Sequence, residues 1–275
     1  HTRLQGDWSS DVCSSDLGLG GRLDATNVSR PVLSIITSIG RDHMRLLGST
    51  ITAIATEKAG IIKRGCPVIS GAAHPDAAAV IAAVAARRRA TLLQVGRDFE
   101  PLCVAEPLRR GDATERFSVG IANSSPAIPP RPEDAAEPYA IGMPGRHQAA
   151  NAALVAVAAR MLDRLGWPIP DRAVVAGIRD TVLPARVEVR SRRPLVVVDA
   201  AHNVDSMVAL VAAVSPLVAR HRPRVLVFAA SEDKEIERML VLVRGSFDHV
   251  VLTRSADRKS TRLNSSHLVI SYAVF

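Results

Sequence analysis

The feature of this sequence that most constrains its fold is an alternation of short apolar runs with longer helical segments. The runs at 31–37, 67–71 and 91–95 are rich in β-branched or aliphatic residues, as expected for strands buried on both faces of a sheet. The segments between them, 50–61 and 76–89, have the length and apolar spacing of helices. Strands alternating with such helices indicate βαβ units and a mostly parallel sheet, so we predict an α/β fold.

The alternation falls into two blocks that meet near Leu183 and Pro184. The first block continues with an irregular, proline-rich stretch at 100–138, in which we expect short antiparallel strands around 116–121. It ends with two further helices, predicted over 148–165 and from a cap at Asp171 to about residue 182.

The second block repeats the pattern of strands and helices. Strands are predicted at 186–190, 195–199, 224–229 and 249–253, and helices at 205–220 and 232–244. We therefore predict two α/β domains, 18–183 and 184–258. Residues 1–17 and 259–275 are Ser-rich, lack clear periodicity and resemble translated adapter sequence, so we expect them to be non-native tails on an internal piece of a longer protein.

The composition argues against several classes of protein. The formal net charge is +8, but the basic runs are not interleaved with the aromatic residues that stack on bases, so we expect no nucleic-acid partner. An anionic small molecule fits the charge equally well. No apolar run is long enough to cross a bilayer, and the three cysteines form no Cys-x-x-Cys pair, as is typical of a reducing compartment. We expect a cytoplasmic monomer without a membrane partner.

A glycine-rich stretch near the start of the first block is the first candidate site. Glycines in the segment 18–21 allow positive φ and a close approach of the backbone to a ligand, and Asp24 and Asn27 add polar groups. The stretch is not a dinucleotide fingerprint, because the third glycine of that motif would have to stand at Leu23. An ordinary glycine turn is the alternative.

Two further candidates lie after the first predicted strand and near the end of the first predicted helix. His43 lies in the loop after the strand, where ligands of α/β sheets bind, and a neutral imidazole there could hold a metal. Lys58 falls at an otherwise apolar helical end, where burial would favour the neutral amine and allow a carbamate to form with carbon dioxide. The alternative for Lys58 is a snorkelling side chain paired with Glu57.

The remaining candidates lie at two helix starts. His147 and Asn151 are four residues apart and share one helical face, where Asn151 could contact a purine edge or a neighbouring loop. Asp199 ends an apolar strand and His202 and Asn203 open the next helix, an arrangement suited to a phosphate or a carboxylate.

Six motifs occur in a specific order along the chain. They are GLGGRLDATN (18–27), TSIGRDH (37–43), EKAGIIK (57–63), MPGRHQAANAAL (143–154), PARVE (184–188) and DAAHN (199–203). Together they resemble folylpolyglutamate synthase / dihydrofolate synthase, a family of the Mur ligase superfamily. The resemblance implies a truncated Mur ligase central domain, with a parallel sheet of the P-loop type, followed by a partial Rossmann-like C-terminal domain.

The resemblance also implies an activity: ATP-dependent addition of L-glutamate to a folate or dihydropteroate carboxylate through an acyl phosphate, with Mg²⁺ as cofactor. It implies that His43 binds magnesium and that Lys58 is carbamylated and helps to hold a second magnesium ion. It further implies catalytic roles for Lys58, Asp24 and His202, with His202 near the reacting carboxylate. Its other implied contacts are Leu23, Asp24 and Ala25 with the pterin substrate, and Asn151, Arg186 and Asp199 with ATP.

The sequence departs from the family pattern in one important respect. The family has a phosphate loop with a Gly-Lys pair, and this chain contains no such pair, so we expect the chain alone to be inactive. Asp16 aligns with an acidic magnesium ligand of the family but falls in a predicted tail. Another Mur-family amide ligase, or a non-catalytic module that binds nucleotides or nucleic acid, are the alternatives.

Overall fold

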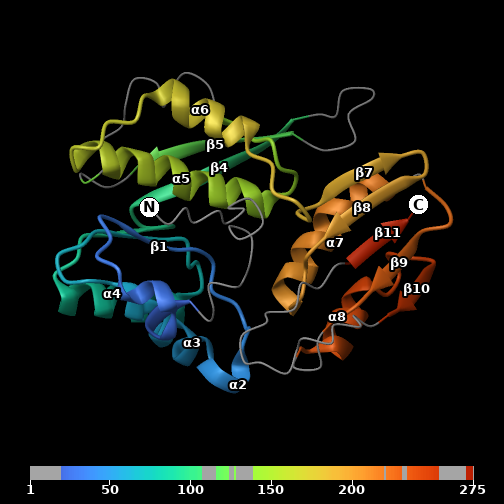
Figure 1. Ribbon diagram of the computed structural model, residues 1–275, viewed down its shortest axis with the longest axis horizontal. Coiled ribbons are helices and arrows are strands. Elements are labelled where there is room, and N and C mark those ends of the chain that lie inside the picture. Colours follow the sequence, from blue (N-terminus) through green and yellow to red (C-terminus); the bar gives the residue numbers. More distant parts are fainter. Residues whose placement is uncertain are drawn as a thin grey trace, which may run out of the picture.

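The computed structural model describes most of the chain as two α/β bodies that lie side by side (Figure 1). The described residues are 20–106, 116–123, 127, 139–219, 221–230, 234–253 and 271–274. The predicted N-terminal tail and most of the predicted C-terminal tail lie outside them, so the predicted domain boundaries stay predictions.

The first body is built on a three-stranded parallel sheet with the order β1-β2-β3, as predicted from the alternation. The strands are β1 (Ser34–Ile36), β2 (Val68–Ser70) and β3 (Leu92–Gln94), and the helices that connect them are α2 (Met44–Leu47), α3 (Ile51–Lys58), η4 (Ala59–Ile61) and α4 (Pro75–Arg88). Two short 3-10 helices, η2 (Gly21–Leu23) and η3 (Ala25–Val28), precede the sheet. Each predicted strand is confirmed, but with fewer residues than its apolar run.

Helices α3 and α4 begin where their sequences supply a cap. The Thr50 hydroxyl accepts a hydrogen bond from the Ala53 amide at the start of α3, and His74 accepts one from the Asp76 amide at the start of α4. Both helices then bury apolar side chains against the sheet, with Ile54 and Ile81 fully buried. This core fixes the loops that leave the carboxyl ends of β1 and β2.

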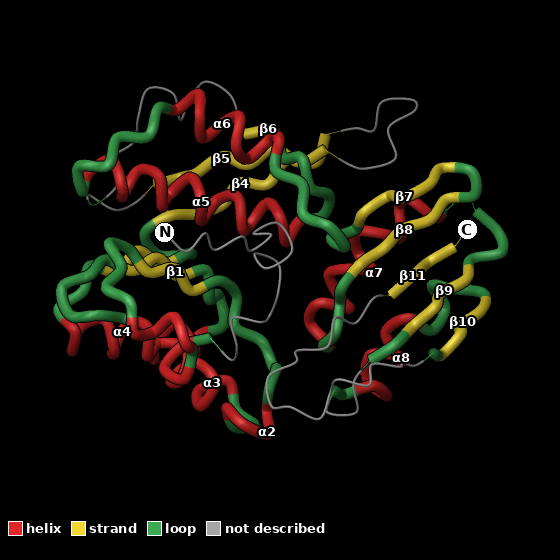
Figure 2. Tube along the Cα trace, viewed as in Figure 1, coloured by secondary structure: helices red, strands yellow, loops and turns green. Residues whose placement is uncertain are grey.

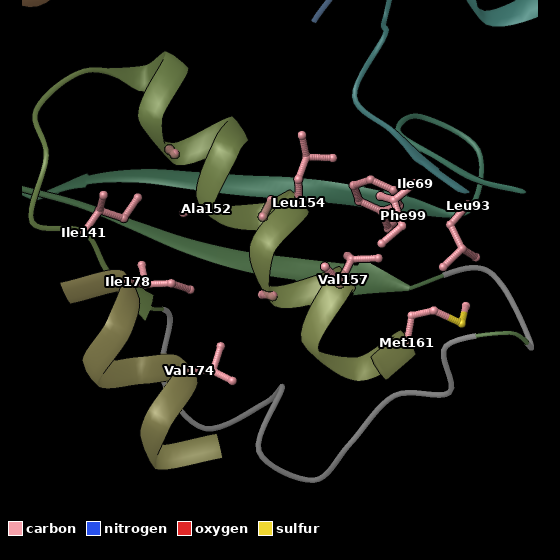
Figure 3. Close-up of a cluster of buried hydrophobic side chains, with 14 residues drawn as sticks. Ile69, Leu93, Phe99, Ile141, Ala152, Leu154, Val157, Met161, Val174 and Ile178 are labelled. Atoms are coloured by element: carbon pink, nitrogen blue, oxygen red, sulfur yellow. The ribbon is translucent and has the colours of Figure 1, made fainter. Parts of the chain in front are cut away.

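A second sheet of the first body is antiparallel, and helix α5 (Arg146–Arg164) covers it. Its strands are β4 (Phe99–Glu106), β5 (Arg116–Asn123) and β6 (Tyr139–Ala140), which confirms the antiparallel strands expected around 116–121. Figure 3 shows Leu154, Val157 and Met161 of α5 in one apolar cluster with Ile69 of β2. Helix α5 therefore joins the two sheets of this body.

Helix α6 (Asp171–Asp180) corrects one prediction. We expected Asp171 to cap it, but Pro170 occupies the N-cap position and Asp171 is the first helical residue. Pro170 has the extended conformation that precedes a helix, and the carboxylate of Asp171 interacts favourably with the positive end of the helix dipole in the first turn.

The second body contains a five-stranded sheet with the order β10-β9-β11-β8-β7. Its elements are β7 (Glu188–Arg192), β8 (Leu195–Asp199), α7 (Val204–Val218), β9 (Val225–Phe228), α8 (Ile236–Val243), β10 (His249–Leu252) and β11 (Ser271–Val274). Strands β8, β9 and β10 run in one direction, and β7 and β11 run antiparallel to their neighbours. Strand β11 falls within the predicted C-terminal tail.

Two elements of the second body begin at least two residues later than predicted. Strand β7 begins at Glu188 rather than at residue 186, because Ala185 and Val187 have positive φ and interrupt the extended backbone. Helix α8 begins at Ile236 rather than at residue 232, and residues 231–233 lie outside the described part.

Helix α7 brings the two bodies together. It lies on the side of the second sheet that faces the first body (Figure 2), and it contacts α5. Its start is fixed by a capping box in which Asn203 and Ser206 exchange side-chain and backbone hydrogen bonds. None of the helices in the part of the chain that the structure describes is long and apolar enough to cross a membrane.

Candidate functional site

The carboxylate of Asp42, in the loop after β1, is the centre of a polar cluster between the two bodies. Its Oδ1 accepts a hydrogen bond from Lys234 Nζ at 2.7 Å. Its Oδ2 lies 3.0 Å from Asn203 Nδ2 and 3.2 Å from His202 Nε2. All three partners belong to the second body, so a single carboxylate of the first body links it to two loops of the second.

The charges of this cluster follow from its contacts. Burial alone would raise the pKa of Asp42, but the hydrogen bonds from His202, Lys234 and Asn203 outweigh burial and hold that pKa far below its usual range. The hydrogen bond that the His202 imidazole donates to Asp42 also raises the pKa of His202. Asp42 is therefore an anion at neutral pH, and His202 has an increased tendency to be protonated.

His43 and Lys58, the two residues predicted to hold metal, both lie near Asp42. His43 has a left-handed backbone at the start of α2, and its Nε2 lies 3.8 Å from Asp42 Oδ2. Burial lowers the pKa of His43, against the attraction of Asp42. Burial also lowers the pKa of the Lys58 amine, against the attraction of Asp42 and Asp24. The negative charge of Asp42 therefore acts on both side chains and favours their protonated forms.

The glycine-rich segment packs directly against the end of α3 that carries Lys58. A Cβ at Gly20 would lie 3.5 Å from Lys58 Nζ. Gly21 has a φ of +74°, and a Cβ there would lie 2.2 Å from the Glu57 carbonyl oxygen. Only glycine allows this approach of two backbones. Glu57, the alternative partner considered for Lys58, has its two carboxylate oxygens 3.0 and 3.2 Å from Arg22.

The predicted pterin-contacting residues lie in this segment. Asp24 is buried, and its carboxylate accepts hydrogen bonds from the amides of Gly20 (3.0 Å) and Thr26 (2.8 Å). Leu23 is 51% exposed, and Ala25 is the first residue of η3. The structure brings Leu23 and Asp24 to the side of the Asp42 cluster that carries Lys58, and their roles toward a substrate stay predictions.

The predicted nucleotide-binding residues line one cavity of about 540 Å³ between the two bodies. Asn151 comes from α5, Arg186 precedes β7, and Asp199 ends β8. His147, which shares the face of Asn151 as predicted, also lines this cavity. Burial and the charge of Arg186 lower the pKa of His147. The structure therefore brings the three residues together, and their roles toward a nucleotide stay predictions.

The carboxylate of Asp199 accepts hydrogen bonds from two backbone amides in the wall of this cavity. Its Oδ2 accepts from the Val187 amide at 2.8 Å and its Oδ1 from the Ala201 amide at 2.7 Å. Burial raises the pKa of Asp199, although these two hydrogen bonds and the charge of Arg186 oppose the rise. Arg186 lies between Ala185 and Val187, which both have positive φ, so Asp199 stabilises the strained turn that presents Arg186.

Among the described residues, no group of three or more His, Cys, Asp and Glu side chains could hold a metal ion. Asp16 lies outside these residues. Magnesium prefers oxygen ligands, and here His43 offers one nitrogen while the carboxylates of Asp24 and Asp42 already accept hydrogen bonds. The donors would fit magnesium if Lys58 carried a carbamate, because that group supplies two oxygens.

Two residues of the cluster, Asp42 and Lys234, were not among the candidates predicted from the sequence. Asp42 directly precedes the predicted metal ligand His43, and its position in a loop after a strand was a usable signal. The signal at Lys234 was weaker: it is a lysine in a chain whose cationic residues are almost all arginine.

The two bodies and the cavity between them define the class of protein. Residues 185–269 match the family model of the Mur ligase, glutamate ligase domain. The chain thus has an α/β fold of the Mur ligase type, as the resemblance implied.

Within this class the chain is homologous to folylpolyglutamate and dihydrofolate synthases. It is 35% identical to the folylpolyglutamate synthase of Lacticaseibacillus casei over 88% of this chain and 53% of that protein. It is 36% identical to the dihydrofolate synthase/folylpolyglutamate synthase of Bacillus subtilis over 84% of this chain and 50% of that protein. The sequence resemblance to this family is confirmed, and the chain spans about half the length of these relatives.

Solved structures give the same result. A folylpolyglutamate synthase in complex with AMPPCP and folate superposes with a TM-score of 0.71 at 33% identity, covering 86% of this chain and 54% of the other. The S73A mutant of the L. casei enzyme superposes with a TM-score of 0.69 at 33% identity, covering 88% and 56%.

Proposed function

We propose that the protein to which this chain belongs is an ATP-dependent ligase that adds L-glutamate to the carboxylate of a folate or a dihydropteroate. The observation that carries the proposal is the shared cavity: Asn151, Arg186 and Asp199 line one space beside the Asp42 cluster. A related structure contains an ATP analogue and folate, as its description says. A nucleotide would lie in the cavity, with the folate at the glycine-rich segment.

The reaction would proceed in two steps, phosphoryl transfer and then amide formation. A carboxylate oxygen of the folate attacks the γ-phosphorus of ATP, and the bond to the bridging oxygen breaks, which gives an acyl phosphate and ADP. The amine of glutamate then attacks the acyl carbon, the amide bond forms, phosphate leaves and a proton is released. Arg186 would stabilise negative charge on the nucleotide, since a guanidinium is positive throughout the physiological range.

The chain's other residues would orient the reactants. His202 would contribute positive charge near the reacting carboxylate, because Asp42 raises the pKa of its imidazole. Asp24 would act near the substrate through the turn that it caps, with Leu23 and Ala25 in contact with the pterin ring. Closure of the cavity between the bodies would exclude water, which would otherwise hydrolyse the acyl phosphate.

A metal site belongs to this proposal. His43 and a carbamate on Lys58 would hold Mg²⁺, and the ion would reduce the repulsion between the carboxylate and the triphosphate. The neutral Lys58 amine would attack carbon dioxide, forming a nitrogen–carbon bond and releasing one proton. Burial of Lys58 lowers its pKa and thereby favours the neutral form that this reaction requires.

The experiment compares the uninterrupted reading frame with the chain of residues 1–275. We expect the longer protein to attach labelled glutamate to folate or dihydropteroate in the presence of ATP, and the present chain to be inactive. In the longer protein, Arg186→Ala is expected to reduce turnover at least tenfold. The matched control, Arg179→Ala, removes an exposed arginine of α6 that pairs with Asp180 and should leave turnover unchanged.

Two outcomes would count against the proposed ligase, and a third against the expected inactivity of the present chain. Turnover of a different acceptor, with none on folate or dihydropteroate, would indicate another Mur-family amide ligase. Salt-sensitive retention on DNA with no effect of ATP would indicate a binding module. Equal activity of both chains would contradict the expected inactivity of residues 1–275.

A further inference from the structure

The contacts between the two bodies are few among the described residues, and they differ in kind. Helices α5 and α7 meet through small residues, since a Cβ at Gly145 would lie only 3.3 Å from the Cβ of Ala213. Such a contact is close but not directional. The Asp205 carboxylate accepts a hydrogen bond from the Arg41 amide at 3.2 Å, and Asp205 is exposed. Neither contact specifies one orientation of the bodies strongly.

The contacts of Asp42 have the opposite character. The Asp42 side chain is 19% exposed and the Lys234 side chain 9%, so their 2.7 Å ion pair is shielded from solvent. Lys234 precedes α8, whereas His202 and Asn203 lie at the start of α7. One carboxylate therefore contacts two separate loops of the second body. Contacts on two loops restrict rotation as well as separation.

We infer that Asp42 is a positioning residue that fixes the orientation of the second body relative to the first, with Lys234 as its charged partner. Asp42 thereby sets the width of the cavity whose walls carry Asn151 on one body and Asp199 on the other. The inference concerns the geometry of this chain and does not depend on the proposed ligase activity. If Asp42 or Lys234 is neutralised, their buried ion pair is lost and the observed orientation of the two bodies is destabilised.

The test measures the orientation directly in the chain of residues 1–275. Spin labels are attached at Arg87→Cys of α4 and Val241→Cys of α8, both exposed, after the native cysteines have been replaced by serine. In the labelled chain without further substitutions, pulsed electron paramagnetic resonance should give one narrow distribution of the distance between the two labels. Asp42→Asn, which keeps the shape of the side chain, should shift and broaden the distribution.

Two further variants make the result specific. Lys234→Met should broaden the distribution in the same way, and the double variant should differ little from the more affected single variant, because both remove one interaction. The matched control is Asp180→Asn, which breaks the exposed ion pair with Arg179 outside the junction and should leave the distances unchanged.

Circular dichroism establishes that each variant is folded before the distances are compared. If Asp42→Asn does not fold, Lys234→Met decides, since that residue lies outside the first body. An unchanged distribution in folded Asp42→Asn and Lys234→Met would overturn the inference. Equal broadening in Asp180→Asn would overturn it as well.

Discussion

The two sides of the proposed site are held in different ways. We call the segment 20–28 the substrate side and the cavity lined by Asn151, Arg186 and Asp199 the nucleotide side, after their proposed roles. On the substrate side, the segment 20–28 is fixed within one body: Gly21 contacts the backbone of Glu57, and Lys63 Nζ contacts the carbonyl and side-chain oxygens of Asn27. On the nucleotide side, the cavity walls come from both bodies, and the polar bridge between those bodies centres on Asp42. One side is thus organised by local packing, and the other depends on how the bodies are oriented.

This difference indicates where each kind of change should act. Substitutions on the substrate side should change the stability of the first body, because backbone contacts there cannot rearrange independently. Substitutions at the junction should change orientation and titration behaviour more than stability.

The largest effect is expected from Gly21→Ala. The added methyl group would overlap the Glu57 carbonyl, and the positive φ of Gly21 is unfavourable for alanine. We expect a loss of about 3–5 kcal/mol in the free energy of unfolding, measured by urea denaturation. The control is Gly177→Ala in α6, where a Cβ would meet no atom within 4 Å. This substitution should stabilise the helix by about 0.5–1 kcal/mol, because alanine has the higher helix propensity. A similar effect of both substitutions would contradict the close backbone packing.

A smaller loss is expected from Asp199→Ala on the nucleotide side. Removing the carboxylate leaves the buried amides of Val187 and Ala201 without their acceptor, at a cost of about 2–3 kcal/mol. Asp199→Asn retains one acceptor oxygen and should lose about half as much. Urea denaturation measures both variants. An equal loss in the two would show that charge, not hydrogen bonding, determines the effect.

The third prediction concerns the pH dependence of the junction. Asp42 raises the pKa of His202, while Lys234 acts in the opposite direction. Because the pKa of His202 is higher in the folded state, its pairing with Asp42 stabilises the fold fully below the ordinary histidine pKa of 6.5. This contribution is lost as pH rises through the higher folded pKa.

Nuclear magnetic resonance titration of the imidazoles measures this shift. Asp42→Asn should lower the pKa of His202 and leave that of His147 unchanged, since burial and Arg186 determine the latter. An unchanged His202 titration in Asp42→Asn would contradict the contact between the bodies.

The sequence was a good guide where structure depends on local pattern. The strands β1, β2 and β3 and their crossover helices follow from apolar runs and helical spacing. The rule that ligands bind at the carboxyl ends of parallel strands also placed His43 at the site. Local rules were sufficient because each of these features depends on neighbouring residues.

Other features could not be predicted from local pattern. Val187 is β-branched, and such residues rarely adopt positive φ, so the turn before β7 was predicted as strand. Asp42 resembles an ordinary loop acid, because its partner His202 lies 160 residues away in the sequence. Asn151, Arg186 and Asp199 share a cavity only through the packing of the two bodies, and the family resemblance, not their spacing, grouped them.

The smallest effect is expected from Arg22→Gln, which removes the ion pair with Glu57 on the substrate side. The Arg22 side chain is 60% exposed, and exposed pairs contribute at most about 1 kcal/mol. The segment would remain fixed by Gly21 and by the hydrogen bonds of Lys63 to Asn27, so Lys63→Met should cost more. Urea denaturation at low and high salt measures both variants, and the effect of Arg22→Gln should vanish at high salt because the pair is screened. A larger loss that persists at high salt would mean that this ion pair, rather than local backbone packing, holds the substrate side together.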